Sequence, residues 1–177
     1  MRLTACIKHL TFDAKFMSRL TDFPSQLRAS TEHPDVVYTR ADGYYAVHGG
    51  TRGPRSSKAV LTLNDGEIAI YKGQPKRGET NATAVYSPSS GGSALNVPTG
   101  QVFVRFASDV DVATQRDSLE SAGFTIAQIL SYAPNGAWLK HKDGDVAAAL
   151  NAIPKLEKLD RVENVEPQLI SPRALRS

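Results

Sequence analysis

The sequence predicts an α+β protein with two domains, each of which combines helices with an antiparallel sheet. Three observations lead to this prediction. Several short segments alternate apolar and polar residues, which is typical of strands. Elsewhere apolar residues recur three or four positions apart, which is typical of helices. Ser, Gly and Pro dominate residues 87–99 and indicate a flexible linker, so we expect a small domain at 1–86 and a second domain at 100–177.

The first domain, residues 1–86, contains one helical pattern and four strand-like segments. Apolar residues spaced three or four positions apart occur at Phe12, Phe16, Leu20, Phe23 and Leu27. This stripe predicts a helix that Pro24 interrupts. Strands are expected at 36–39, 43–48, 58–63 and 67–72. Asn64-Asp65-Gly66 lies between the last two, and its composition is typical of a hairpin turn.

The second domain begins with a strand at 101–107. Val102, Val104 and Phe106 face one side of this strand, and Phe103 and Arg105 face the other. A helix is expected at 111–122, and Gly123 is a suitable residue to end it. A strand at 124–132 follows, then a turn at 133–135.

The rest of this domain completes a regular order of elements. We expect a strand at 136–141, a capping residue within 143–145, a helix at 146–153 and a short last strand with Val162 and Val165. The order is β-α-β-β-α-β, which is the ferredoxin-like arrangement. It predicts a four-stranded antiparallel sheet with both helices on one face and an open face on the other.

Composition narrows the function classes. The formal net charge is +3, and the basic surplus lies in residues 1–98, with 12 basic and 8 acidic residues; residues 99–177 have 9 and 10. The single cysteine, Cys6, excludes an internal disulfide. Because no apolar run approaches the roughly 18 residues that span a bilayer, we expect no membrane insertion. The N-terminus has no continuous apolar core of a signal peptide, so we expect a cytoplasmic protein.

Motifs for catalysis and metal binding are weak. His48 heads a Gly-rich string at 48–53, but no nucleophile elbow, P-loop or dinucleotide motif accompanies it. The histidines are scattered, at His9, His33, His48 and His141. We therefore predict no metal, no cofactor and no enzymatic activity, and we keep a hydrolase built around His48 as the least favoured alternative.

The open sheet face is the first functional clue. Phe103 and Trp138 are candidates for this face. They can pack on the first domain, form a surface for a protein partner, or stack on RNA bases. Nucleic acid is disfavoured, because the basic-Gly-aromatic-Gly signature of RNA-binding strands is missing and this half is slightly acidic.

A more specific pattern extends over residues 100–174. It comprises Gly100–Phe106, a helix that ends at Gly123-Phe124, the segment Tyr132–Leu139, and Val162–Pro167 followed by an extended tail. This pattern resembles the prodomain of subtilisin-like serine proteases and the free-standing inhibitors related to it. The resemblance implies an inhibitor and folding chaperone that binds such a protease, in trans or, if the chain is a precursor fragment, in cis. Residues 1–99 lie outside it.

The resemblance also implies roles for particular residues. The open face would pack on two surface helices of the protease, and Glu166 would cap those helices. Gln168 occupies the position of a second acid and brings no charge. The tail would lie extended in the protease cleft, with Ala174 or, after a one-residue slip, Leu175 at the last subsite. The tail residues are Leu169, Ile170, Ser171, Pro172, Arg173, Ala174 and Leu175. The alternative is a nucleic-acid or ligand-binding module that uses the same open face.

Overall fold

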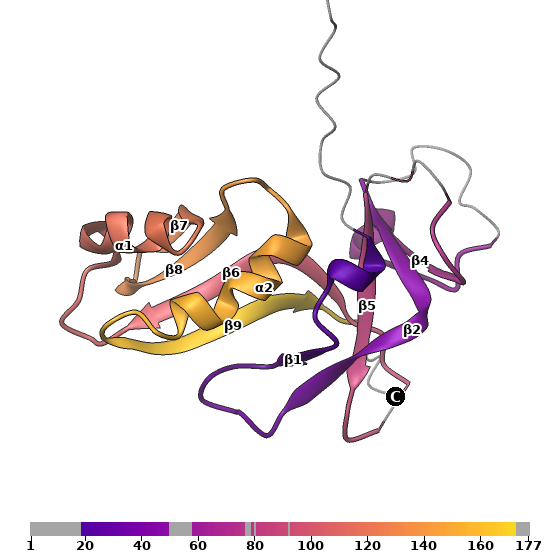
Figure 1. Cartoon of the computed structure of the whole chain (residues 1–177), viewed down its shortest axis with the longest axis horizontal. Helices are drawn as coiled ribbons and strands as arrows, with labels where there is room; N and C mark the ends of the chain where they lie inside the picture. Colours follow the sequence, from indigo (N-terminus) through magenta and orange to yellow (C-terminus); the bar gives the residue numbers. More distant parts are fainter. Residues whose placement is uncertain (1–18, 50–57, 77–78, 80, 92, 173–177) are drawn as a thin grey trace, which may run out of the picture.

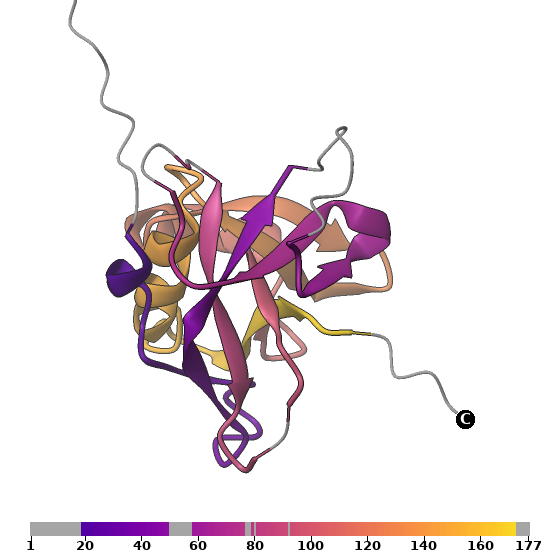
Figure 2. The ribbon, with the colours of Figure 1, turned by 90° about the vertical axis from the view of Figure 1, so that its right-hand side faces the viewer.

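The computed structural model describes residues 19–49, 58–76, 79, 81–91 and 93–172. These residues form two sheets of antiparallel strands with few helices, so the predicted α+β class is confirmed. Figure 1 shows the two sheets side by side, with the longest helix in front of the second sheet. Figure 2, a view from the side of the first sheet, shows the first sheet in front of the second.

The first sheet contains β1 to β5, and β2 lies at its centre. Its strands are β1 (Gln26–Arg28), β2 (Val37–His48), β3 (Leu61–Leu63), β4 (Ile68–Lys72) and β5 (Ala82–Pro88). The strand β2 pairs with β1, β4 and β5, and β3 pairs with β4. The expected hairpin joins β3 to β4, and Asn64, Asp65 and Gly66 all have a positive φ there. The sequence patterns did not predict β1 or β5.

The predicted helix around Pro24 is wrong within the described residues. Only a 3₁₀ turn at Leu20–Asp22 is helical, Leu27 lies in β1, and Phe12 and Phe16 lie outside the described residues. Phe23 is extended, because the residue before a proline avoids the helical region.

The segments 36–39 and 43–48, expected as separate strands, fall in one strand, β2, which begins at Val37. An irregularity in the pairing with β5 between Arg40 and Tyr45 accommodates Gly43 at φ +96°. The segment between the two predicted strands therefore continues the ladder as a bulge instead of ending it.

The second sheet contains four strands in the spatial order β7-β8-β6-β9. They are β6 (Val97–Phe106), β7 (Phe124–Leu130), β8 (Ala133–His141) and β9 (Val162–Ile170). The 3₁₀ turn Val112–Gln115 and α1 (Arg116–Ser121) connect β6 to β7, and α2 (Val146–Leu156) connects β8 to β9. The turn predicted at 133–135 is wrong, because these residues begin β8 and the turn lies at Ser131-Tyr132.

The helix ends follow the sequence signals. A carboxylate oxygen of Asp111 accepts a hydrogen bond from the backbone N–H of Ala113 at 2.9 Å, and Asp145 accepts one from Ala148 at 2.7 Å. Gly123 follows α1 with φ +98°, a conformation that favours glycine. The predicted cap and stop are therefore present.

The predicted linker is shorter than 87–99. Residues 87 and 88 end β5, Asn96 pairs with Tyr86, and Val97 begins β6 and is fully buried. Val97 and Pro98 pair with β9 and are buried. The Ser- and Gly-rich composition of residues 87–99 gave no indication of this pairing. Residues 89–95 therefore separate the strands, and of these residue 92 lies outside the described part of the chain.

Three buried clusters form the core, and one of them joins the two halves of the chain. Helix α2 contributes Ala147 and Leu150 to a cluster that also contains Phe23, Leu27, Ala84 and Tyr86. The Tyr86 hydroxyl donates to the Pro24 carbonyl at 2.8 Å, and burial raises the pKa of Tyr86. The other clusters lie between the second sheet and its helices, and within the first sheet. The predicted domains are thus packed together through α2.

This shared cluster predicts cooperative unfolding. Leu150 is 3% exposed, so we expect Leu150→Ala to lower the free energy of unfolding by about 2–5 kcal/mol. Urea titrations followed by Trp138 fluorescence and by far-UV circular dichroism should give coincident transitions before and after the substitution. The exposed Lys155→Ala on the same helix serves as the control and should change the free energy by less than about 0.5 kcal/mol. Separate transitions for the two probes would contradict the shared core.

Candidate functional site

An aromatic pair lies on the face of the second sheet that the helices do not cover. Val102, Val104 and Leu139 pack with α1 and α2, and side chains alternate along a strand, so Phe103 and Trp138 face the other side. The two residues are directly paired between β6 and β8, and their ring centroids are 5.3 Å apart. Both are half-buried. The sheet therefore presents a preformed apolar contact at its centre.

A continuous row of side chains crosses this face through the aromatic pair. The strand register aligns Gln128 of β7 with Trp138, Trp138 with Phe103, and Phe103 with Glu166 of β9. The row is polar at both ends and aromatic in the middle. Such an arrangement, an apolar centre within a polar rim, is typical of protein-binding surfaces.

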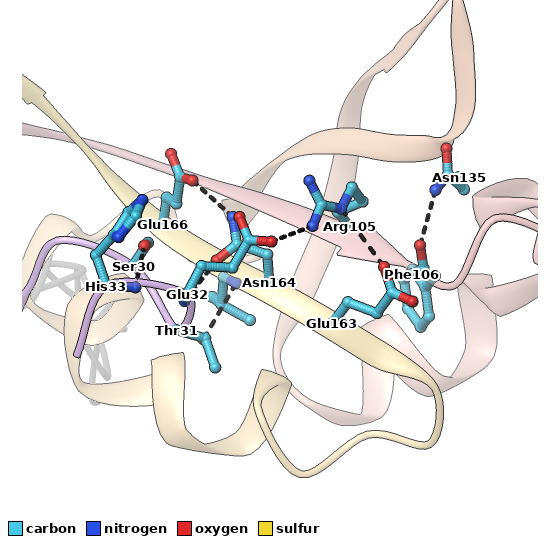
Figure 3. A network of polar contacts seen from close by, with 11 residues as sticks. Ser30, Thr31, Glu32, His33, Arg105, Phe106, Asn135, Glu163, Asn164 and Glu166 are labelled. Atoms are coloured by element: carbon cyan, nitrogen blue, oxygen red, sulfur yellow. Dashed lines mark hydrogen bonds and ion pairs between the residues drawn. The ribbon is translucent and has the colours of Figure 1, made fainter.

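The β9 side of the face carries a polar network (Figure 3). A Glu166 oxygen accepts from the Asn164 amide nitrogen at 2.6 Å. The Arg105 guanidinium is 2.5 Å from Glu32 and 3.6 Å from Glu163. Two carboxylates therefore contact one guanidinium, and with Glu166 nearby this part of the face has an acidic excess. These ion pairs are partly exposed, so each contributes little to stability.

A segment of the first half of the chain closes the β9 edge of the sheet. The Thr31 backbone N–H donates to the Val165 carbonyl at 3.2 Å, and the Thr31 hydroxyl accepts from the Val165 N–H at 3.2 Å. The Glu32 N–H donates to the Asn164 side-chain oxygen at 3.4 Å. Sequence analysis missed this segment, because the partners lie more than 130 residues apart and no local pattern marks them.

The expected tail begins later than the sequence predicted. Gln168, Leu169 and Ile170 lie in β9, and the ladder pairs Leu169 with Pro98 and Ile170 with Val97. The Gln168 side chain also accepts from the Thr99 hydroxyl at 2.6 Å. The expectation of a free tail from Leu169 is therefore wrong for Leu169 and Ile170, since these two residues are held in the protein's own sheet.

The remaining tail residues follow β9. Ser171 donates from its hydroxyl to the Asn96 side-chain oxygen at 2.5 Å, and Pro172 is half-buried. The expected subsite residues Arg173, Ala174 and Leu175 lie outside the described residues.

The histidine of the alternative hydrolase hypothesis lies in the first sheet, at the end of β2. A ring nitrogen of His48 is 2.8 Å from the Thr83 hydroxyl, which resembles the contact between a base and a nucleophile. Thr83 is only 4% exposed, so a substrate cannot reach this hydroxyl in the structure. Most of the 48–53 string lies outside the described residues. The pair is a satisfied polar contact within the sheet.

Within the described ranges, no group of three or more His, Cys, Asp or Glu side chains could hold a metal ion. In the same part of the chain, the helices are too short or too polar to cross a membrane. Cys6 and His9 lie outside it.

Comparison with known protein families, with curated proteins and with solved structures found no match for this chain. The resemblance to protease prodomains therefore stays a prediction from the sequence pattern. The surface itself, and not a relative, has to support any proposal about function.

The half-buried position of His48 predicts a pH dependence of stability. Burial lowers the pKa of His48 below its usual value, so the unfolded chain binds a proton more readily than the native state. This contribution to stability is complete above about pH 6.5 and is lost as the pH falls below that value. We expect His48→Gln, which keeps a hydrogen-bonding group near Thr83, to lose less free energy of unfolding than the wild type between pH 8 and pH 5. Equal losses in urea titrations at the two pH values would refute this role of His48.

Proposed function

We propose that this protein inhibits a subtilisin-like serine protease and assists its folding, and that it binds the protease through the open face of the second sheet. The observation that carries this proposal is the row from Trp138 and Phe103 to Glu166 on that face. The order β6-α1-β7-β8-α2-β9 and the spatial order β7-β8-β6-β9 support the finer, ferredoxin-like interpretation of the second half.

The chemistry of the face fits a partner that presents helices. Aromatic residues that are half-buried in the free protein can provide anchors with little loss of side-chain entropy on binding. A carboxylate beside them can accept hydrogen bonds from the unpaired N–H groups at a helix N-terminus and interact favourably with its dipole. Glu166 is at the right place in the row for this role, at the end next to Phe103.

The length of β9 limits which residues can enter the protease cleft. Residues 168–171 are held by β6 and by Asn96 of the protein itself. The segment proposed to enter the cleft is therefore Pro172 to Leu175. It would add as an extended strand, where backbone pairing provides affinity and side chains fill subsites.

The alternative is a nucleic-acid or ligand-binding module, and the exposed sides of Phe103 and Trp138 are the observation in its favour. The carboxylates of Glu32, Glu163 and Glu166 on the same side of the sheet disfavour a polyanion. A salt titration of oligonucleotide binding separates the two functions, since phosphate contacts give a steep salt dependence.

The test is inhibition of a panel of purified subtilisin-like proteases. We expect tight inhibition of at least one of them. Trp138→Ala should weaken binding by about 2 kcal/mol or more, because an aromatic anchor is lost. Deletion of residues 173–177 should weaken it strongly. If no protease of the panel is inhibited by the intact protein, the proposal fails.

The role of Glu166 has a matched test. Glu166→Gln should weaken inhibition by about 1–3 kcal/mol, because a charged acceptor at a helix N-terminus is replaced by a neutral one. Glu120→Gln is the control: it makes the same change on α1, on the opposite side of the sheet, and should leave the inhibition constant unchanged. Equal effects of the two substitutions would argue against a helix-capping role.

A further inference from the structure

The ladder between β6 and β9 continues beyond the second sheet into the first half of the chain. Its main part pairs residues 102–106 with 162–167. After an irregularity, where Gly100 has φ +83°, it resumes with Val97 opposite Ile170 and Pro98 opposite Leu169. The end of β9 is therefore held by residues that precede the prodomain-like region.

Burial attaches this end of β9 to the core of the first sheet. Val97 is fully buried in a cluster with Ala46, Ile70 and Val85, and Ile170 packs against this cluster. Leu169 packs against the other cluster, which contains Tyr86. The last two residues of β9 thus pack against the cluster of the first sheet and the cluster shared with α2, and not in the core of the second sheet.

Asn96 connects this packing to the first residue after β9. Its side chain is almost completely buried, at 3% exposure. Its amide nitrogen donates to the carbonyls of Tyr86 at 3.2 Å and Ala94 at 3.3 Å, and its oxygen accepts from the Ser171 hydroxyl at 2.5 Å. The donors and the acceptor are all used, so the orientation of the carboxamide is determined.

The backbone of Asn96 is also held. It exchanges hydrogen bonds with Tyr86 at 2.7 Å and 2.8 Å, which places it on the buried strand β5. Asn96 therefore connects strand β5 of the first sheet directly to Ser171, the first residue after β9.

We propose that Asn96 is a positioning residue, and that Asn96, Val97 and Pro98 form a clamp that fixes the root of the C-terminal tail at Leu169–Ser171. This gives the first half of the chain a role: it determines from which point the tail departs. The use of a fixed root rests on the proposed protease-inhibiting function, because a tail with an ordered root loses less conformational entropy when it enters a cleft.

Hydrogen–deuterium exchange of the full chain tests the clamp without any protease. Ser171→Ala removes the hydroxyl of an exposed residue and keeps the buried Asn96. We therefore expect this variant to fold normally. We expect the backbone amides of residues 169–171 to exchange roughly 3- to 10-fold faster, as expected for the loss of one hydrogen bond. Asn96→Ala, which also frees two carbonyls, should accelerate them at least as much.

Asn135→Ala is the matched control. Its amide nitrogen also donates to a backbone carbonyl, that of Phe106 at 2.8 Å, but at the opposite end of β6 (Figure 3). It should leave the exchange of residues 169–171 unchanged. Unchanged exchange in both Ser171→Ala and Asn96→Ala would overturn the clamp.

Inhibition measurements separate the clamp from the proposed function. Ser171→Ala should weaken inhibition by the intact chain roughly 3- to 10-fold and should have no effect once residues 173–177 are deleted. If exchange accelerates but inhibition by the intact chain is unchanged, the positioning role is refuted. If the wild type inhibits no protease, the proposed function fails, and the exchange rates still decide whether the clamp exists.

Discussion

The long ladder between β6 and β9 is the constraint on which the rest of the structure depends. These two strands are neighbours in the second sheet. The start of β6 at Val97 and the end of β9 at Ile170 pack in the cluster of the first sheet. Strands β6 and β9 therefore contribute residues to the cores of both sheets. A change in the register of this ladder would move every alternate side chain to the other face, and would disturb the core under α1 and α2 together with the clusters that hold Val97 and Ile170.

This constraint also determines which surfaces are available for binding. Helices cover one face of the second sheet, and the segment around Thr31 covers its β9 edge. Neither these helices nor this segment covers the face that carries Phe103 and Trp138, and this is the face we propose for a partner. Its acidic side is formed jointly by β9 and the segment before β2, since Glu32 comes from the first half and Glu166 from the second. The proposed binding surface is therefore built from both halves of the chain.

Much of the second half could be predicted because its signals are local. Asp145 caps α2 through a backbone group three residues away, and Gly123 ends α1 through its own φ. The alternation of residues 101–107 placed Phe103 and Arg105 on one face. The first half was harder. Its apolar stripe around Pro24 predicted a helix that the described residues do not form. Strand β1 is only three residues long, and residues 83–86 of β5 are all buried, so neither strand shows an alternating pattern.

The sequence by itself determined the class of fold, the hairpin at residues 64–66, the cap of α2 and the stop after α1, and it supplied Phe103 and Trp138 as candidates for the open face. The tertiary structure alone decided that Val97 and Pro98 are strand and not linker, that Leu169 and Ile170 are strand and not tail, and that Asn96 binds Ser171. The physical reason is distance along the chain. Caps and turns depend on neighbours within a few residues, whereas these pairings join residues more than 65 positions apart, and their energy comes from burial that only the assembled core provides.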